Sequence, residues 1–262
     1  MTKLVDNKVI LIFGGTGGMG WEAASLMMEH GAKLLVTGRE INDVQHINNL
    51  NNPSIYAIAQ DATLPGNAEK AIEICHSKFG TIDGMYHVAG ASGRAYGDGP
   101  LHEMTDEGWD QTLLMNLKSI MMTNRAMVRY WMEHNLAGSI LNIGSILGIS
   151  PSPKYFYTHA YAASKAGVIG FSKAVASYYA SYNIRVNVLV PSLINTPMSQ
   201  RSMKNEEIMH FIKTKQPLDG GRVGLPNDCS GAVLYFMSDL SRFTTGQALC
   251  IDGGWSISDG QI

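Results

Sequence analysis

Two side chains, Tyr161 and Lys165, have the types and the spacing needed for proton transfer. They stand four residues apart in a segment with helical periodicity, so both fall on one face of that helix. A free phenol has a pKa of about 10, and a nearby ammonium group favours its ionised form. We therefore expect the pKa of Tyr161 to be lowered toward neutrality. Such a phenol could donate a proton to an oxygen bound to carbon, or remove one from it.

Ser145 and Asn116 could assist this chemistry. Ser145 ends an apolar strand, directly after Asn142-Ile143-Gly144, and could donate a hydrogen bond to a substrate oxygen. Asn116 lies within a long helical segment and could hold a water molecule behind the lysine as a path for the proton. Together the four residues could reduce a carbonyl group or oxidise an alcohol, provided that a hydride carrier binds beside them.

A glycine cluster between the first strand and the first helix could bind the diphosphate of such a carrier. The run GGTGGMG, from Gly14 to Gly20, follows an apolar strand directly. Glycines there allow phosphates to approach the helix N-terminus, where unpaired N–H groups and the helix dipole favour negative charge. The glycines Gly14, Gly18 and Gly20 give the spacing GxxxGxG, and no Walker lysine follows. The cluster therefore predicts a dinucleotide site rather than a P-loop.

The end of the second strand favours NADP(H) over NAD(H). An acidic residue there would accept hydrogen bonds from the adenosine ribose, whereas an arginine can pair with the 2′-phosphate of NADP. Here Gly38 stands at the acidic position and Arg39 follows it. NAD(H) stays an alternative, since Arg39 could instead pair with Glu40 in solvent. Asp61 follows the third strand and could accept from the adenine amino group, although an aspartate that only caps its own loop fits equally well.

An alternation of apolar strands and helices positions these residues. Strands are predicted over 8–13, 33–37, 54–59, 84–89, 139–143, 184–190 and 248–251. Helices are predicted over 22–30, 41–50, 67–79, 109–134, 160–182 and 227–238. Apolar strands separated by helices indicate an α/β fold, a doubly wound parallel sheet with helices on both faces. Because no linker or repeat interrupts the pattern, residues 1–262 are expected to form a single domain.

Two stretches fit this alternation poorly and are candidate substrate loops. They lie near 146–160, which holds two prolines and three aromatic residues, and at 192–216. Both follow strand ends, where ligands bind in open α/β sheets. The residues expected to contact substrate are Ser92, Ser145, Leu147, Tyr155, Tyr157 and Met198. This wall could suit an acyl chain, a ring or a sugar face; added polar contacts from Arg94 and Asn195 favour a polyol, sugar or other small hydroxylated ketone.

Composition excludes several classes of protein. The net charge of −2 argues against binding nucleic acid, which needs a clustered basic excess. No apolar run approaches the ~18 residues of a membrane span. The three cysteines lack CxxC spacing, so we expect reduced thiols, no metal site and a cytoplasmic location. Charged residues make up 16% of the chain against a usual figure of about 25%. That low share is consistent with surface buried in a homo-oligomer.

Taken in chain order, the motifs resemble those of the short-chain dehydrogenase/reductase family in its single-domain form. The resemblance runs from the first strand to near the C-terminus. It rests on Gly14-x3-Gly18-x-Gly20, Asp61, Ala89-Gly90, Asn116, Asn142-Ile143-Gly144-Ser145, Tyr161-x3-Lys165, Arg185-x-Asn187, Pro191, Thr196 and Asp252-Gly253-Gly254. It implies a seven-stranded Rossmann sheet and hydride transfer between NADP(H) or NAD(H) and a secondary alcohol or ketone. It also implies assembly as a homotetramer.

The resemblance further implies roles for individual residues. Tyr161 would be the general acid/base, and Lys165 would bind the nicotinamide ribose and lower the tyrosine pKa. Ser145 would contact the substrate, Asn116 would belong to a water relay and Thr196 would lie near the carboxamide. The implied cofactor-binding set is Gly14, Thr16, Gly17, Gly18, Met19, Gly20, Arg39, Asp61, Ala62, Ala89, Gly90, Tyr161, Lys165, Pro191, Ser192, Ile194 and Thr196.

The sequence departs from the family pattern beside the expected cofactor site. The usual Asn-Asn-Ala-Gly is here His87-Val88-Ala89-Gly90, and Phe13 and Ser192 replace the usual threonine and glycine. The alternative function is a non-catalytic dinucleotide-sensing protein on the same fold. Such a protein would be expected to lose the tyrosine or the lysine, and both are present. An epimerase on a related fold would carry a C-terminal substrate domain longer than the segment after Pro191, so that interpretation is disfavoured.

Overall fold

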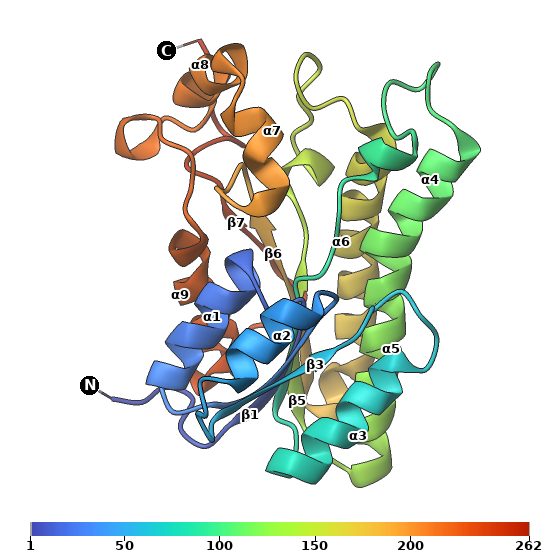
Figure 1. Cartoon of the computed structure of the whole chain (residues 1–262), viewed down its shortest axis with the longest axis vertical. Helices are drawn as coiled ribbons and strands as arrows, with labels where there is room; N and C mark the ends of the chain where they lie inside the picture. Colours follow the sequence, from blue (N-terminus) through green and yellow to red (C-terminus); the bar gives the residue numbers. More distant parts are fainter. Residues whose placement is uncertain (1, 262) are drawn as a thin grey trace.

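The computed structural model describes residues 2–261. Its strands are β1 (Val9–Phe13), β2 (Lys33–Gly38), β3 (Ile55–Ala59), β4 (Gly84–His87), β5 (Gly138–Ile143), β6 (Ile184–Pro191) and β7 (Ala248–Ile251) (Figure 1). Its α-helices are α1 (Gly18–Glu29), α2 (Ile41–Asn48), α3 (Asn67–Phe79), α4 (Asp106–Leu113), α5 (Ser119–His134), α6 (His159–Tyr179), α7 (Gln200–Met203), α8 (Glu206–Lys215) and α9 (Pro226–Met237).

The strands pair in the order β3-β2-β1-β4-β5-β6-β7, and all of the pairings are parallel. The chain moves outward from β1 in one direction to β3 and then returns to β4 on the other side of β1. A crevice opens at such a reversal, outside the carboxyl ends of β1 and β4, and ligands bind there in sheets of this kind. The expected doubly wound seven-stranded α/β sheet is confirmed.

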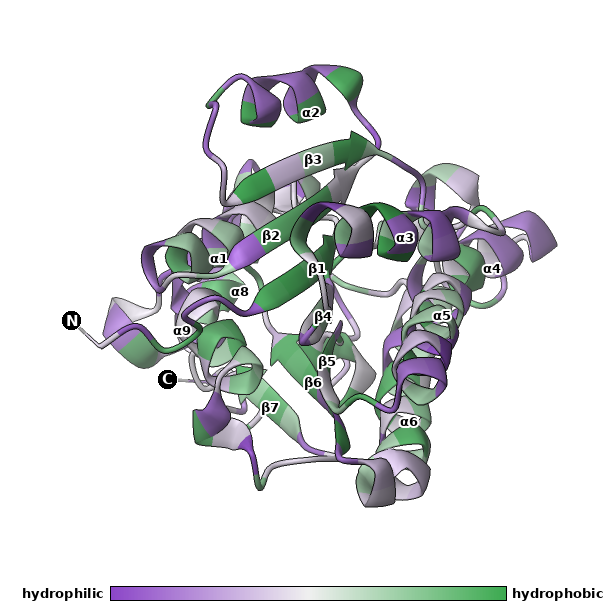
Figure 2. Ribbon diagram, turned by 90° about the horizontal axis from the view of Figure 1, so that it is seen from below, coloured by the Kyte–Doolittle hydropathy of each residue, from purple (hydrophilic) through white to green (hydrophobic). Residues whose placement is uncertain are grey.

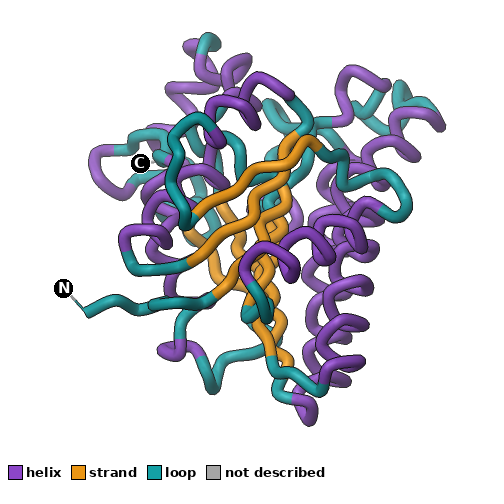
Figure 3. The backbone as a smooth tube through the Cα atoms, turned by 60° about the horizontal axis from the view of Figure 1, so that its bottom comes forward, coloured by secondary structure: helices purple, strands orange, loops and turns teal. Residues whose placement is uncertain are grey.

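The sheet is covered on both faces because its strands are apolar on both faces. In β1, Ile10 and Ile12 belong to a core with α1, α2 and α9, whereas Leu11 and Phe13 belong to a core with α3, α5 and α6. Figure 2 shows these helices on either side of the strands, and Figure 3 shows the strands as one twisted layer. Full burial of an aliphatic side chain contributes about 1.5–3 kcal/mol, so this double cover holds the strand ends in fixed positions.

Two helices differ from the prediction near the crevice. α1 begins at Gly18, inside the glycine cluster, rather than at residue 22. The helix expected over 109–134 starts at Asp106, because the Thr105 hydroxyl accepts a hydrogen bond from the Gly108 N–H at 2.9 Å. It is also interrupted by a π-helical turn, Leu114–Lys118, which separates α4 from α5.

The stretch at 192–216 is largely helical and forms α7 and α8. Asn205 caps α8 by accepting a hydrogen bond from the N–H of Ile208 at 2.9 Å. Ile208 and Ile212 are buried in an apolar cluster with Trp255. In Figure 1 this segment, α4 and the loop before α6 gather at the upper end of the molecule, beyond the carboxyl ends of the strands.

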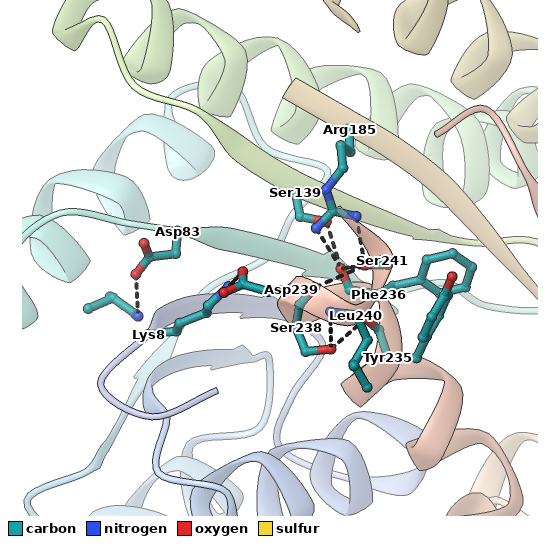
Figure 4. A network of polar contacts seen from close by, with 11 residues as sticks. Lys8, Asp83, Ser139, Arg185, Tyr235, Phe236, Ser238, Asp239, Leu240 and Ser241 are labelled. Carbon is teal, nitrogen blue, oxygen red and sulfur yellow. Dashed lines mark hydrogen bonds and ion pairs between the residues drawn. The ribbon is translucent and has the colours of Figure 1, made fainter. Parts of the chain in front are cut away.

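The opposite, amino edge of the sheet is held by a polar network (Figure 4). The Arg185 guanidinium in β6 donates to the Ser241 hydroxyl at 2.8 Å and to the Phe236 carbonyl at 3.1 Å. Lys8, just before β1, forms an ion pair with Asp239. These contacts join the sheet to the end of α9, so its amino edge is fixed by contacts within the protein.

Within the described part of the chain, no helix is both long enough and apolar enough to cross a lipid bilayer.

Candidate active site

Two adjoining cavities lie at the carboxyl edge of the sheet. The first, here called the glycine cavity, has a volume of about 310 Å³ and is lined by Gly14, the start of α1 and the ends of β2 and β3. The second, here called the tyrosine cavity, has a volume of about 400 Å³ and is lined by Tyr161, the end of β5 and the segment after β6. Both share Met19, Gly90 and Thr196, so they form one crevice.

The glycine cluster shapes the first cavity by the close approach of backbone to backbone. Gly14 has φ +88°, and a Cβ atom there would lie 2.7 Å from the Ala89 nitrogen. A Cβ atom on Gly20 would lie 2.2 Å from the Gly14 carbonyl oxygen. Gly20 does not line the cavity, so its absence of a side chain serves the packing of the turn onto α1 rather than ligand contact.

The start of α1 fits an anionic group such as a diphosphate. Gly17 is the N-cap residue and supplies no side-chain cap, and a Cβ atom on it would meet nothing within 4 Å. Gly17, Gly18 and Met19 all line the glycine cavity. Unpaired N–H groups and the positive end of the helix dipole therefore face open space that could admit phosphate oxygens.

The far end of the glycine cavity contains Arg39 and Asp61. A Cβ atom on Gly38 would lie 2.1 Å from the Thr16 hydroxyl oxygen, so no carboxylate side chain fits there without movement of Thr16. Arg39 is exposed and forms no ion pair with any described residue, Glu40 included. Asp61 lines the cavity and also caps its own turn, since one carboxylate oxygen accepts from the Thr63 N–H at 2.8 Å.

Tyr161 and Lys165 occupy the first turns of α6. The Asp98 carboxylate fixes this helix end by accepting the N–H groups of Ala160 and Tyr161, each at 3.0 Å. The Lys165 ammonium nitrogen lies 5.6 Å from the centroid of the Tyr161 ring and donates to the Ile143 carbonyl at 3.0 Å. Lys165 is only 2% exposed. The two residues therefore share one face of α6, as their spacing predicts, and this face lies at the end of β5.

Burial changes the acidities from those expected. Desolvation raises the pKa of Tyr161 above its ordinary value, although a hydrogen bond with Ser145 opposes the increase. Desolvation lowers the pKa of Lys165 to about 7. The expected lowering of the tyrosine pKa is therefore wrong for the protein without ligand. A buried ammonium that is itself partly neutral at pH 7 does not offset the loss of water around the phenolate.

Ser145 and Asn116 both line the tyrosine cavity. Ser145 is buried, and its hydroxyl oxygen accepts from the Leu147 N–H at 3.3 Å. Asn116 lies in the π-helical turn, where its amide group donates to the Ala91 carbonyl at 2.8 Å and accepts from the Ala91 N–H at 3.2 Å. The amide of Asn116 therefore anchors the loop after β4, and its part in a water relay stays a prediction.

The remaining residues expected to bind cofactor are distributed over both cavities. Those that line the glycine cavity are Thr16, Ala62, Ala89 and Gly90. Those that line the tyrosine cavity are Pro191, Ser192 and Ile194, and both Gly90 and Thr196 line the two cavities.

The substrate wall differs from the prediction at two aromatic residues. Ser92, Ser145, Leu147 and Met198 line the tyrosine cavity as expected, but Tyr155 and Tyr157 do not. Tyr155 packs against Phe211, with ring centroids 5.2 Å apart, and Tyr157 lies against Arg94. The cavity is lined instead by Phe156, together with Trp255. Residues 153–155 form a turn, and the residue that follows it, Phe156, is the one that reaches the cavity.

His87, at the end of β4, is fully buried beside the crevice. Its Nδ1 lies 2.8 Å from the Thr123 hydroxyl oxygen, and its ring stacks on Phe13 with centroids 5.8 Å apart. Burial, together with the nearby Lys165 charge, lowers the pKa of His87 to about 3. A neutral imidazole held in this way suits a core histidine rather than a catalytic base.

Comparison with known proteins decides the family. Residues 14–256 match the family model described as enoyl-(acyl carrier protein) reductase. A Chlamydia muridarum protein named 3-oxoacyl-[acyl-carrier-protein] reductase FabG is 34% identical over 263 residues, covering 97% of this chain and 99% of the relative. This chain belongs to the short-chain dehydrogenase/reductase family. Like other members of the short-chain dehydrogenase/reductase family, it is an oxidoreductase.

Other short-chain dehydrogenases/reductases resemble it over nearly their whole length. The L-rhamnose-1-dehydrogenase of Scheffersomyces stipitis is 30% identical, with 97% of this chain and 98% of the relative covered. A Brucella melitensis structure described as a glucose/ribitol dehydrogenase has a TM-score of 0.84 and 26% identity, covering 97% of this chain and 99% of that one. Levodione reductase has a TM-score of 0.85 and 25% identity, with 96% of this chain and 98% of the neighbour covered.

Proposed function

We propose that this short-chain dehydrogenase/reductase transfers a hydride between NADP(H) and a secondary alcohol or ketone, with Tyr161 as the general acid/base. The observation that carries the proposal is the meeting of Tyr161, Lys165 and Ser145 in a cavity continuous with the glycine cavity. NAD(H) is the other possible cofactor. The relatives support the reaction type, since their names describe reductases and dehydrogenases.

The nicotinamide cofactor would supply or accept the hydride when bound, and this chain's residues fit it. The start of α1 would hold the diphosphate, because its N–H groups face the glycine cavity without a side-chain cap. Arg39 would pair with the 2′-phosphate, since it is exposed and forms no ion pair with a described residue. Gly38 leaves no carboxylate at the position that would select NAD(H).

In the reducing direction Tyr161 would donate its proton to the substrate carbonyl oxygen. Its raised pKa keeps the phenol protonated at neutral pH, which is the state that a proton donor needs. The Ser145 hydroxyl would hold the same oxygen, and a protonated Lys165 would stabilise the phenolate that remains. General acid catalysis of this kind is worth about 10²–10⁴-fold in rate. The Asn116 amide keeps the floor of the cavity in place through the loop at Ala91.

The substitution Tyr161→Phe tests this function. We expect NADPH oxidation with a panel of small ketones, followed by absorbance at 340 nm, to fall about 10²-fold or more. The binding of NADPH, followed by calorimetry, should be nearly unchanged. Tyr155→Phe is the matched control, because Tyr155 packs against Phe211 outside the cavity. Undiminished turnover by Tyr161→Phe would contradict the assigned role. Cofactor binding without turnover of any ketone by the unmodified protein would instead favour the dinucleotide sensor.

We also propose that the chain works in the cytoplasm as a homotetramer of single-domain subunits. Its low charge content and an edge strand, β7, with the exposed apolar residue Leu249 support a surface that associates with other copies. Cys75 and Cys229 are buried free thiols, which suits a reducing compartment.

A further inference from the structure

The tyrosine cavity carries positive charge that the proposed reaction does not explain. Arg94, Arg201 and Lys165 all line it, whereas none of the described residues that line it is an aspartate or a glutamate. Lys165 is accounted for by its place beside Tyr161. The two arginines are not, because they come from other elements: Arg94 from the 3₁₀ turn Gly93–Tyr96 after β4, and Arg201 from α7 after β6.

Neither arginine is neutralised by the protein. Among residues 2–261, no carboxylate lies within 4.0 Å of the Arg94 or Arg201 guanidinium group. Asp98 is the acidic residue that influences Arg94, but both of its oxygens accept N–H groups at the start of α6. Both arginines line the same cavity, and burial together with the charge of Arg201 lowers the pKa of Arg94. Two like charges facing one cavity favour an anion between them.

The structure positions Arg94 by several contacts. A Cβ atom on Gly93 would lie 1.6 Å from the Thr112 hydroxyl oxygen, so the chain passes α4 closely at this point. The Ser92 hydroxyl accepts the N–H of Arg94 at 3.4 Å and caps the turn. The guanidinium carbon lies 5.1 Å from the centroid of the Tyr157 ring. A cation stacked on an aromatic face is held in place at the cavity wall.

The arginines lie apart from the groups suited to the cofactor phosphates. Neither Arg94 nor Arg201 lines the glycine cavity, where the start of α1 and Arg39 face the space for a dinucleotide. Beside the arginines, the tyrosine cavity is lined by apolar side chains such as Leu147, Phe156 and Trp255. An organic molecule with a short apolar part and one charged end would match both features of this wall.

We propose that the substrate carries an anionic group, a carboxylate or a phosphate, which Arg94 and Arg201 bind while Tyr161 and Ser145 hold its carbonyl or hydroxyl oxygen. This inference rests on the proposed function and adds a substrate class to it. Guanidinium groups suit both anions, because their N–H donors form paired hydrogen bonds with either. Tyr157, which lies outside the cavity, acts as a positioning residue for Arg94.

Matched substrate pairs test the inference. With NADPH, 4-oxopentanoate is compared with its methyl ester, and dihydroxyacetone phosphate with dihydroxyacetone. We expect kcat/KM to favour one charged member over its neutral partner by about 10- to 100-fold, the usual effect of hydrogen bonds to a charged group. The pair that shows this preference identifies the anion as carboxylate or phosphate. The preference should decrease with added salt, because screening weakens attraction into a positive cleft.

Arg94→Gln and Arg201→Gln keep polar side chains of similar length and remove the charge. Each should lower kcat/KM for the charged substrate about 10-fold or more and should lower that for the neutral partner far less. Calorimetry supplies a readout without turnover: the NADPH-loaded protein should bind pentanoate or a short alkyl phosphate more tightly than pentanamide, and each variant should lose that difference. Arg242→Gln is the matched control, because Arg242 lies at the amino edge of the sheet, away from the crevice.

Three outcomes would overturn the inference. In the first, the protein reduces ketones but turns over and binds charged and neutral compounds equally well. This result would leave the proposed function unaffected. Another is a loss of NADPH affinity in Arg94→Gln and Arg201→Gln, which would assign both arginines to the cofactor. The third is NADPH binding without reduction of any compound and without anion binding, and here the proposed function falls as well.

Discussion

Lys165 is a cation held almost without water, with the Ile143 carbonyl as its hydrogen-bond partner. Its pKa falls from the ordinary value of 10.5 to about 7, so part of its population is neutral at physiological pH. Burying a charged group in this way lowers the free energy of unfolding of the protein, a cost that is common at functional sites. Substrate anions or polar cofactor groups that enter the crevice would favour the charged form.

Lys165→Met should therefore stabilise the protein at neutral pH while abolishing turnover. At 1.36 kcal/mol per pKa unit, the fall from 10.5 to about 7 corresponds to roughly 5 kcal/mol, which is the upper limit of the expected gain. Between the folded and unfolded pKa values, from about 7 to 10.5, the unfolded state binds more protons, so the stability of the unmodified protein rises with pH. Urea unfolding should show a large advantage of the variant at pH 7 that shrinks by pH 10. A constant difference across this range would contradict the buried charge.

Arg39 is the side chain on which we expect the choice between NADP(H) and NAD(H) to depend. The Arg39 side chain lines the glycine cavity, and no described carboxylate pairs with it. The substitution Arg39→Ala should therefore weaken NADPH binding about 10- to 100-fold and NADH binding far less. Calorimetric titration with each nucleotide measures both losses. Lys33→Ala, an exposed lysine at the opposite end of β2, is the control. Equal losses for the two nucleotides would show that Arg39 does not read the 2′-phosphate.

At the scale of elements, the start of α6 and the π-helical turn 114–118 set the geometry of the site. Both carboxylate oxygens of Asp98 accept N–H groups from the first turn of α6, which carries Tyr161. The π-helical turn places Asn116 against the loop at Ala91. Such turns occur often at functional sites, where the extra residue shifts one side chain relative to a regular helix.

Asp98→Ala should destabilise the protein by about 1–3 kcal/mol, because two N–H groups at the start of α6 would lose their buried acceptor. The helix end that carries Tyr161 would also be less well fixed, so kcat should fall more than the affinity for NADPH. Thermal unfolding and steady-state kinetics measure the two effects. Asp110→Ala, at an exposed position of α4, should change neither. Unaltered stability of Asp98→Ala would contradict its role as the cap of α6.

At the scale of the whole molecule, β7 is an edge strand that pairs only with β6 among the described strands. Leu249 in β7 is 39% exposed, although it is a large apolar residue in a strand. Natural proteins rarely leave such an edge open to water, because it can pair or pack with another chain. This edge is therefore the surface on which we expect subunits to meet.

Light scattering should give a mass of about four chains for the unmodified protein, as the family resemblance implies. Leu249→Lys should shift the population to smaller species, since it puts a charge on the expected contact. Ile41→Lys, at another exposed apolar position, should leave the mass unchanged. A single-chain mass for the unmodified protein would contradict assembly altogether.

The sequence by itself determined the features that depend on local periodicity and backbone sterics. Runs of apolar residues predicted all seven strands, because a strand buried on both faces needs them. The glycine cluster predicted the turn at Gly14, where a side chain would collide with Ala89. The spacing of Tyr161 and Lys165 placed them on one helix face, as the structure has them.

Tertiary structure alone decided the features that depend on distant neighbours. Burial by several elements, not the residue four positions away, sets the acidities of Tyr161 and Lys165. The packing of Tyr155 on Phe211 removes it from the cavity, and helix α8 forms because its apolar face has Trp255 to cover. Arg94 and Arg201 stand more than a hundred positions apart in the chain. They reach the same cavity because β4 and β6 are parallel strands of one sheet, whose carboxyl ends lie at the same edge. Burial and contact between distant residues arise only when the chain is packed, so neither can be read from spacing along the sequence.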